Sequence, residues 1–401
     1  MSGGRQWRRA GPLLGQRLEL QIGAVANLGC CVARHEGRVV FVRHALPGER
    51  VVAMVTEDKG GSFCRADAVS ILTPSPDRVA PPCPFAGPGR CGGCDWQHAT
   101  PEAQRRLKAD VVRELFARIG QLELGDMRVE EVPGGSFGWR TRAQFAVDDS
   151  GQPGLRRSRE HSIQPIDDCL LTVPAIRAEL AAGPRRPGTM LDVAASATGE
   201  VSVGERVGRQ RPPGDLLHER AIGRDWEVHA GGFWQVHPEA AGTLVDCALD
   251  FLAPLPGERA LDLYAGVGLF SGALAAAVGP DGLVTAVESD VTAAEDATRN
   301  LADLPQVRVR SGDVAALLDE VLPTDIAVLD PPRAGAGRAV IEALVHSGLR
   351  AIGYVSCDAA TLAADVRVAR DNGFELTALR VFDLFPNSHH VECVALLVPA
   401  V

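Results

Sequence analysis

Two polar residues near the carboxyl end of the chain could together carry covalent chemistry. Cys357, in Ser356-Cys357-Asp358, directly follows the apolar run 351–355, and Glu392 lies in His389-His390-Val391-Glu392-Cys393. A cysteine thiolate can add to an electron-poor carbon, and a nearby carboxylate can then remove a proton. In isolation, Cys357 would be a small buried residue and Glu392 a solvated charge. Both gain a chemical role only if the fold places them over one pocket.

A glycine turn and an acidic strand end could bind a cofactor. Tyr264-Ala265-Gly266-Val267-Gly268 follows an apolar run and precedes an alanine-rich helix, so Gly266 and Gly268 would let the backbone approach a ligand. Glu288 ends the next strand, where a carboxylate can accept hydrogen bonds from both ribose hydroxyls. The third glycine of a dinucleotide site is missing, which favours S-adenosylmethionine over NAD. A packing glycine pair with a solvated Glu288 is the structural alternative.

Asp330 is a further candidate for the same pocket. It follows the apolar run 326–329 and precedes Pro331-Pro332-Arg333, so two prolines would hold it rigidly at a strand end. A plain strand-ending turn would have the same sequence. We expect Asp330 to lie beside the end of the strand that carries the glycine turn.

Four of the ten cysteines are spaced as ligands. Cys83 precedes Cys91-Gly92-Gly93-Cys94, and Cys169 could supply a fourth thiolate. The chain is long and its basic start lacks a secretory apolar segment, so ligation is a better interpretation than a disulfide framework. Both zinc and iron–sulfur clusters bind soft thiolate ligands, so the ligand type does not distinguish between them. An empty vestigial site is a third interpretation. The remaining cysteines, at positions 30, 31, 64, 247 and 393, are expected to be core or surface thiols.

The elements that would position these residues change along the chain. Residues 13–73 alternate short β-rich runs with glycine turns, which is typical of a small closed barrel, and a series of prolines follows. From about residue 240, strands and helices alternate, which predicts a parallel sheet covered on both faces and a final antiparallel hairpin. The predicted segments are a disordered tail (1–12), the barrel (13–73), an α/β middle domain with the cysteine cluster (74–235) and a catalytic domain (236–401).

Charge is distributed unevenly over the 401 residues. The net charge is −10, but residues 1–70 carry ten Lys and Arg against six Asp and Glu, whereas residues 231–401 carry ten against 23. A locally basic front end can bind nucleic acid even in an acidic protein. Arg140, Arg142 and Arg156–Arg159 form a second candidate surface. No apolar run is long enough to span a membrane, so we expect a cytoplasmic protein without a membrane partner, and we infer no obligate protein partner.

From about residue 13 to its end, the chain resembles the RNA 5-methyluridine methyltransferases. Gly232-Phe233-Trp234-Gln235-Val236 is similar to the Phe-x-Gln segment of that family, Ser356-Cys357 to its nucleophile motif and His390-Val391-Glu392 to its general-base motif. The resemblance implies that Gln235, Tyr264, Gly266, Gly268, Glu288 and Asp330 bind the cofactor. It also implies an α/β fold of the class I methyltransferase type, a Rossmann-like seven-stranded sheet with an antiparallel C-terminal hairpin. The N-terminal barrel resembles the RNA-binding TRAM domain.

The reaction implied by this resemblance is methylation of uracil C5. Addition of the Cys357 thiolate to C6 makes C5 nucleophilic, and Glu392 then removes the C5 proton. Cys83, Cys91, Cys94 and Cys169 are similar to the [4Fe-4S] ligands of a branch of the family, which favours the cluster over zinc. The barrel and the cysteines resemble the large-subunit rRNA branch more than the compact tRNA branch, although some relatives with both features act on tRNA.

Three positions depart from the family pattern. Leu269 replaces a frequent polar Asn, which puts a side-chain contact to the cofactor there in doubt. His237 replaces the usual Asn after the glutamine, and Asp358-Ala359 replaces Asn-Pro after the nucleophile. Two other function classes remain open. A noncatalytic RNA-binding iron–sulfur protein would have no need for Cys357 and Glu392, and a methyltransferase acting on exocyclic amines would want an aromatic residue where Arg333 stands.

Overall fold

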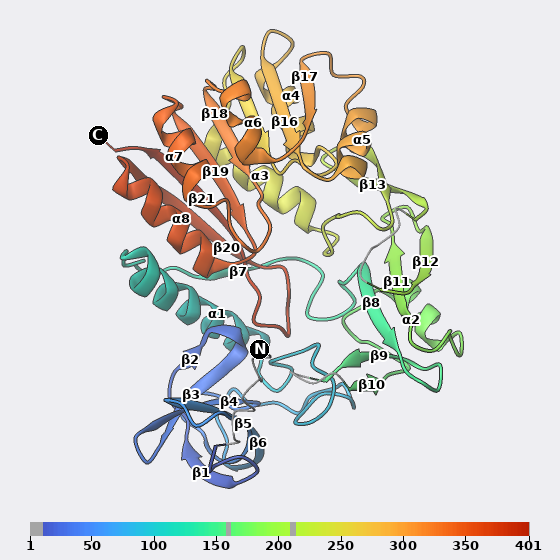
Figure 1. Ribbon diagram of the computed structural model, residues 1–401, viewed down its shortest axis with the longest axis vertical. Coiled ribbons are helices and arrows are strands. Elements are labelled where there is room, and N and C mark those ends of the chain that lie inside the picture. The colour runs from blue at the N-terminus through green and yellow to red at the C-terminus, as the bar shows by residue number, and fades with distance from the viewer. Residues whose placement is uncertain (1–10, 158–161, 209–213, 401) are drawn as a thin grey trace, which may run out of the picture. The chain divides into compact units, whose positions relative to one another are not determined.

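The computed structural model describes residues 11–157, 162–208 and 214–400. The chain divides into two compact units (Figure 1). Unit 1 consists of residues 1–111, 155–164 and 386–389, and unit 2 of residues 112–154, 165–385 and 390–401. Most of the predicted N-terminal tail, residues 1–10, lies outside the described residues, as does Arg159 of the second predicted RNA surface.

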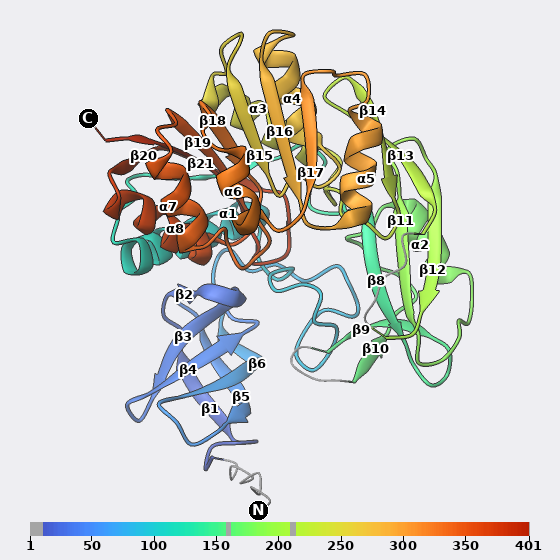
Figure 2. The same ribbon diagram turned by 45° about the horizontal axis from the view of Figure 1, so that its top comes forward.

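Unit 1 begins with a barrel of short strands (Figure 2). Its described strands follow the order β1-β5-β6-β4-β3-β2, with bounds β1 (Arg17–Gln21), β2 (Val25–Ala26), β3 (Cys30–His35), β4 (Arg38–Arg43), β5 (Arg50–Asp58) and β6 (Phe63–Thr73). The backbone after β1 reaches β3, where Gly23 N donates to Val32 O at 2.7 Å. A Cβ at Gly23 would lie 2.9 Å from that oxygen, so this closing contact requires glycine.

Helix α1 (Pro101–Leu115) follows the proline- and cysteine-containing loop and runs across the boundary between the units. Pro101 stands at its first position, where its missing N–H costs nothing, and Thr100 Oγ1 accepts from Ala103 N at 3.3 Å. A π-helical turn, η2 (Phe116–Gly120), continues the helix into unit 2. The chain is therefore helical from Pro101 to Gly120, with its last turn widened.

Unit 2 contains a sheet whose described strands follow the order β17-β16-β15-β18-β19-β21-β20-β7. Their bounds are β15 (Arg259–Leu263), β16 (Leu283–Glu288), β17 (Val307–Ser311), β18 (Ile326–Leu329), β19 (Ala351–Ser356), β20 (Phe374–Asp383), β21 (Glu392–Pro399) and β7 (Val129–Glu131). The strands β15 to β19 are parallel, and β21 is antiparallel to both β19 and β20. This is the predicted class I methyltransferase arrangement. An eighth strand, β7, pairs with β20 and was not expected from the sequence.

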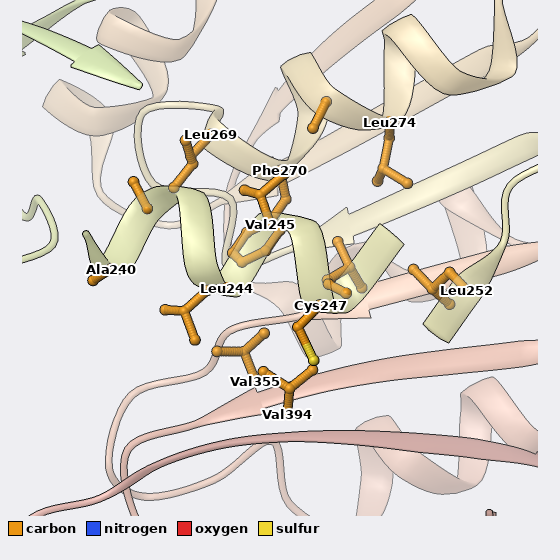
Figure 3. Close-up of a cluster of buried hydrophobic side chains, with 14 of the residues drawn as sticks. Ala240, Leu244, Val245, Cys247, Leu252, Leu269, Phe270, Leu274, Val355 and Val394 are labelled. Atoms are coloured by element: carbon orange, nitrogen blue, oxygen red, sulfur yellow. The ribbon is translucent and has the colours of Figure 1, made fainter. Parts of the chain in front are cut away.

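Helices cover both faces of this sheet, as predicted for parallel strands that are buried on both sides. They are α3 (Ala240–Leu252), α4 (Leu269–Val278), α5 (Val291–Asn300), α6 (Val314–Val321), α7 (Arg338–His346) and α8 (Ala359–Asp371). Helices α3, α4 and α5 contribute to one buried cluster with strands β15 to β21. In Figure 3, Leu244 and Cys247 of α3 point toward Val355 and Val394, and Val245 lies against Phe270 of α4.

The remaining elements form a second, smaller sheet and a hairpin. The described strands of this sheet follow the order β10-β9-β8-β11-β12, with bounds β8 (Arg142–Val147), β9 (Pro153–Arg156), β10 (Ile163–Pro165), β11 (Met190–Ala195) and β12 (Val201–Arg206). Helix α2 (Pro174–Ala181) packs on β11, and β13 (Leu216–Ala221) pairs with β14 (Arg224–His229). Across the described ranges, no helix combines the length and apolarity that crossing a membrane requires.

Candidate active site

Three segments that are distant in sequence meet at the carboxyl ends of the central parallel strands of unit 2. In the strand register, Leu263 of β15 pairs with Leu329 of β18, and Leu329 with Tyr354 of β19. Asp330 N also donates to Leu263 O at 3.3 Å. Because the chain leaves each parallel strand at the same edge, the predicted residues after these strands share one region of the sheet.

The glycine turn after β15 is held by the carboxylate at the end of β16. Gly266 N donates to Glu288 Oε2 at 2.8 Å, and Asp290 N donates to Oε1 at 2.7 Å. Tyr264 has φ 64°, which a non-glycine residue adopts only at a cost, and Gly268 has φ 93°. A Cβ at Gly268 would lie 2.6 Å from Leu301 Cδ1. The predicted cofactor residues Tyr264, Gly266 and Gly268 therefore form one tight loop at the N-terminus of α4, and Glu288 at the end of β16 is hydrogen-bonded to it.

A buried carboxylate beneath this loop was not predicted from the sequence. Asp262 lies within β15 and is fully buried, and Ser271 Oγ of α4 donates to its Oδ2 at 2.6 Å. Among the described residues, its Oδ1 atom has no hydrogen-bond partner. Burial raises the pKa of Asp262 to about 7. The polar residue inside the run Ala260-Leu261-Asp262-Leu263 was the signal available in the sequence.

Cys357 and Glu392 are placed opposite each other by the pairing of β19 with β21. Ser356 pairs with Cys393 in these antiparallel strands, so the residue after Ser356 faces the residue before Cys393. Glu392 is only 3% exposed, and Cys357 is partly buried. The structure thus brings the two predicted catalytic residues together at the edge where β18 ends in Asp330.

Burial and mutual repulsion raise the pKa of each acid in this group. Burial is the main cause for Asp330, whose pKa rises to about 7. Burial followed by the charge of Asp330 raises the pKa of Glu392 well above its usual value. Burial followed by the charge of Glu392 raises the pKa of Cys357 to about 11. Two such carboxyl groups repel each other as anions, so they do not both ionise easily near neutral pH.

Arg333 supplies the opposing positive charge. It lowers the pKa of both Cys357 and Glu392 against the effect of burial, and its Nη2 lies 3.3 Å from His390 Nε2. From the sequence, Arg333 was predicted only to disfavour an exocyclic-amine methyltransferase. Its place in the loop after Asp330 was the signal that could have identified it.

A buried hydrogen-bond network holds the end of the loop that carries Arg333. Tyr354 OH donates to Asp365 Oδ2 at 2.7 Å, and both accept from Ala336 N at 2.9 Å. Gly337 N also donates to Asp365 Oδ2, at 3.2 Å. This network connects β19 and α8 to the loop between Asp330 and α7, and it limits how far that loop can move.

The segment that contains Gln235 is clamped by two adjacent residues at the start of β8. Thr141 N and Oγ1 donate to Val236 O at 2.8 and 3.0 Å, and Arg142 Nη1 donates to Ala230 O and Gly232 O at 3.1 Å. Gln235 itself is buried.

Phe233 is exposed and Arg142 is buried. Phe233 is 64% exposed, although the neighbouring Trp234 is buried, and no separate role was predicted for this phenylalanine. Arg142 is 7% exposed and lies 3.4 Å from Glu219. The prediction that Arg142 belongs to an RNA-binding surface is wrong, because its buried guanidinium group binds backbone carbonyl groups and the Glu219 carboxylate.

The departures from the family pattern have local structural roles. Leu269 is buried at the start of α4, so it makes a core contact instead of a polar one. Asp358 caps α8, because its Oδ1 accepts from Ala360 N at 2.9 Å and Thr361 N at 3.1 Å. His237 is buried and stacked on Trp139, and burial lowers its pKa to about 4.

The predicted cluster ligands are divided between the units. Cys83, Cys91 and Cys94 belong to unit 1, and Cys169 belongs to unit 2. Gly93 N donates to Cys91 Sγ at 3.4 Å, and Gln97 Nε2 donates to Cys94 Sγ at 3.1 Å. Within the part of the chain that is described, no three His, Cys, Asp or Glu side chains are grouped closely enough to hold a metal ion.

Comparison with known proteins adds to this geometry. The family described as tRNA (Uracil-5-)-methyltransferase matches residues 223–399, and the TRAM domain matches residues 13–69. A Streptomyces avermitilis protein named "Uncharacterized RNA methyltransferase" is 48% identical over 96% of this chain and 99% of its own. The 23S rRNA (uracil(1939)-C(5))-methyltransferase RlmD of Chromohalobacter salexigens is 35% identical over 94% of this chain and 88% of its own.

A solved structure also has the same fold over nearly the whole chain. It is the Pyrococcus abyssi tRNA (uracil-54, C5)-methyltransferase in complex with S-adenosyl-L-homocysteine. The TM-score is 0.72 at 23% sequence identity, and the match covers 94% of this chain and 100% of that one.

Proposed function

The chain belongs to the RNA uracil-C5 methyltransferase family, and we propose that it methylates uridine C5 through a covalent bond between Cys357 and uracil C6. One observation carries the proposal. The pairing of Ser356 with Cys393 sets Cys357 opposite the buried Glu392, at the strand end that carries Asp330. A thiol and a carboxyl group in this arrangement serve both halves of the reaction.

Side chains of this protein carry out the first and last steps of the reaction. The Cys357 thiolate forms a bond to C6, and the C5–C6 π electrons move toward O4 to give an enolate. A bound S-adenosylmethionine would supply the methyl group to C5, with cleavage of its S–CH3 bond and S-adenosylhomocysteine as the leaving group. Glu392 then accepts the C5 proton, and the released electron pair restores the C5–C6 double bond and expels the thiolate.

The raised pKa values suit Glu392 to this role. A carboxylate in water is too weak a base, whereas a buried carboxylate beside a second acid holds a proton more tightly. Because Asp330 and Glu392 repel each other as anions, Glu392 holds a proton that it accepts from C5 more tightly than an isolated carboxylate would. The high pKa of Cys357 makes the thiolate scarce but strongly nucleophilic, and Arg333 offsets part of that cost.

We assign cofactor binding to the loop around β15 and to the neighbouring strand ends. Glu288 would accept from the ribose hydroxyls with the lone pairs that Gly266 N and Asp290 N leave free. Tyr264, Gly268, Asp330 and Gln235 would complete the site. Phe233, exposed beside Gln235, would stack on the target base after it leaves the RNA helix.

We propose 23S rRNA as the substrate, with tRNA as the alternative. The support is the similarity along the whole chain to a protein named as a 23S rRNA uracil methyltransferase and the TRAM match at residues 13–69. The test is methylation of protein-free rRNA fragments and unmodified tRNA transcripts by the purified protein. If only tRNA accepts the methyl group, the rRNA assignment fails and the C5 chemistry stands.

We also propose a [4Fe-4S] cluster on Cys83, Cys91, Cys94 and Cys169, with zinc as the alternative occupant. The support is the spacing of the cysteines and the two N–H groups that already donate to Cys91 Sγ and Cys94 Sγ, as cluster sulfurs favour. We derive no catalytic step through this cluster. Metal analysis after anaerobic purification tests it directly.

A further inference from the structure

Helix α5 packs against β14 (Figure 2) and also contacts the glycine loop, residues 264–268. At the start of the helix, the backbone N–H of Asp290 donates to Glu288 Oε1 at 2.7 Å, and the other oxygen of this carboxylate accepts from the glycine loop. At its far end, Asn300 Nδ2 donates to Val267 O, within the loop, at 3.2 Å. Both ends of α5 are therefore tied to the predicted cofactor residues.

Asn300 also binds both backbone polar groups of one residue of β14. Its Oδ1 accepts from Glu227 N at 2.8 Å, and its Nδ2 donates to Glu227 O at 3.0 Å. With the bond to Val267 O, both amide hydrogens and one acceptor site of this buried side chain are in use. A single side chain thus joins the glycine loop to β14.

One turn earlier on the same helix, Asp296 holds the last residue of β14. Asp296 is 1% exposed, its Oδ2 accepts from His229 N at 3.1 Å, and its Oδ1 lies 2.8 Å from His229 Nδ1. Arg299 Nη2 also binds Oδ1. A carboxylate is costly to bury on a helix unless it is paired, and it only accepts, so it fixes the direction of the His229 ring.

The chain that follows His229 leads directly to the predicted substrate residues. His229 O accepts from Gly232 N at 2.8 Å, which closes a short turn immediately before Phe233. Phe233 is exposed, and Gln235 lies two residues further on. The position of α5 therefore sets where this segment begins.

We propose that the α5 bridge, defined as His229, Asp296 and Asn300, makes binding of the cofactor and binding of the target uridine strengthen each other. A ligand that orders the glycine loop also orders α5, and α5 then holds the segment with Phe233 and Gln235. The second ligand consequently loses less conformational freedom when it binds. The three bridge residues act as positioning residues. The inference rests on the proposed function, since it takes Phe233 and Gln235 to receive the uracil.

The test measures how far a saturating oligouridylate lowers the Kd of S-adenosyl-L-homocysteine for the full chain. An oligonucleotide of about twelve nucleotides is suitable, because a single strand needs no helix opening before a uracil reaches Phe233. The wild type should show a factor of at least about five, within the usual range of coupling between sites. His229→Ala should reduce the factor to about one. His229→Asn should restore most of it, because the asparagine amide can still donate to Asp296.

His218→Ala is the matched control. His218 lies in the same hairpin, and its Nδ1 is 2.9 Å from Glu200 Oε1, so this variant removes a histidine–carboxylate contact that does not involve α5. Its coupling factor should equal that of the wild type. Linkage also requires the cofactor analogue to change the Kd of the oligouridylate by the same factor. A residue that only stabilises the fold would change the melting temperature and leave this factor as it is.

The outcomes separate this inference from the proposed function. A wild-type factor of one, or an unchanged factor in His229→Ala, would overturn the bridge even if the protein methylates uridine. Equal loss of the factor in His218→Ala would also overturn it, because any loosening of the hairpin would then suffice. If the wild type shows the factor and His229→Ala loses it, but no uridine is methylated, the bridge stands and the proposed function fails.

Discussion

The strand edge in unit 2 and the cysteine loop in unit 1 were both identified from residue types and spacing, but the fold treats them differently. At the strand edge, backbone ladders bring Asp330, Cys357 and Glu392 together from three segments. The loop that contains Cys83, Cys91 and Cys94 has no such ladder, and its described cysteines form no metal-binding group. Regular structure therefore groups the predicted side chains of the strand edge without a bound group, whereas the cluster stays a prediction whose geometry a bound group would have to set.

The largest expected effect is on the nucleophile. Cys357→Ala should reduce methyl transfer by at least about 10³-fold, because no other group can form the C6 adduct. Cys247→Ala is the matched control, since Cys247 is a buried cysteine of α3 in the same unit. The measurement is transfer of radiolabelled methyl from S-adenosylmethionine to RNA. Normal turnover by Cys357→Ala would contradict the covalent mechanism. It would also remove the main chemical reason for placing the active site at the strand edge.

Glu392→Gln should slow turnover by about 10²–10⁴-fold through loss of the general base. The adduct should still form, because the thiol and the methyl donor site are unchanged. A protein–RNA band that survives a denaturing gel should therefore accumulate in this variant and not in Cys357→Ala. Rapid turnover without that band would mean that another group removes the C5 proton.

The cysteine loop can be tested through its iron content. Anaerobically purified protein should hold about four irons per chain, as a cubane on four thiolates requires. Cys94→Ser should lose most of that iron, whereas Cys64→Ser, in the barrel core, should retain it. Stoichiometric zinc without iron would replace the cluster assignment, and a metal-free protein would leave the loop as a structural element alone.

The pH dependence follows from the raised pKa values at the strand edge. The Cys357 thiol, with its pKa raised to about 11, is almost wholly protonated at neutral pH, so raising the pH increases the thiolate. The raised pKa of Glu392 acts in the same direction, because its base form is lost as the pH falls. Hence kcat/KM should rise by up to about tenfold per unit between roughly pH 6 and pH 8. A kcat/KM that does not change with pH across that interval would contradict the raised pKa values of Cys357 and Glu392.

The smallest effect concerns the residue next to the nucleophile. Asp358→Ala removes the cap of α8 and should lower the free energy of unfolding by about 1 kcal/mol. Asp358→Asn should retain most of that stability, because asparagine caps helices equally well. Denaturant unfolding of the two variants measures the difference. If both lose the same stability, the carboxylate has a role that its hydrogen bonds to the helix do not explain.

Much of the fold could be predicted from the sequence because it depends on local patterns. Alternation of apolar strands and helices after residue 240 predicted the parallel sheet, and the final two strands predicted the hairpin. Glycines at positions 266 and 268 marked the turn after β15, where positive φ values are required. The strand β7 was missed because its three residues carry no periodicity of their own and pair only through β20.

The sequence by itself determined which residues follow the strands and therefore reach the common edge, since parallel strands end together. It did not determine which charges are buried, because burial depends on what the rest of the chain packs against each side chain. Only the tertiary structure shows that Arg142 is buried and donates hydrogen bonds to backbone carbonyl groups. It also places Arg333 near Cys357. The contacts of Asn300 with β14 and with the glycine loop likewise join residues that no local pattern connects.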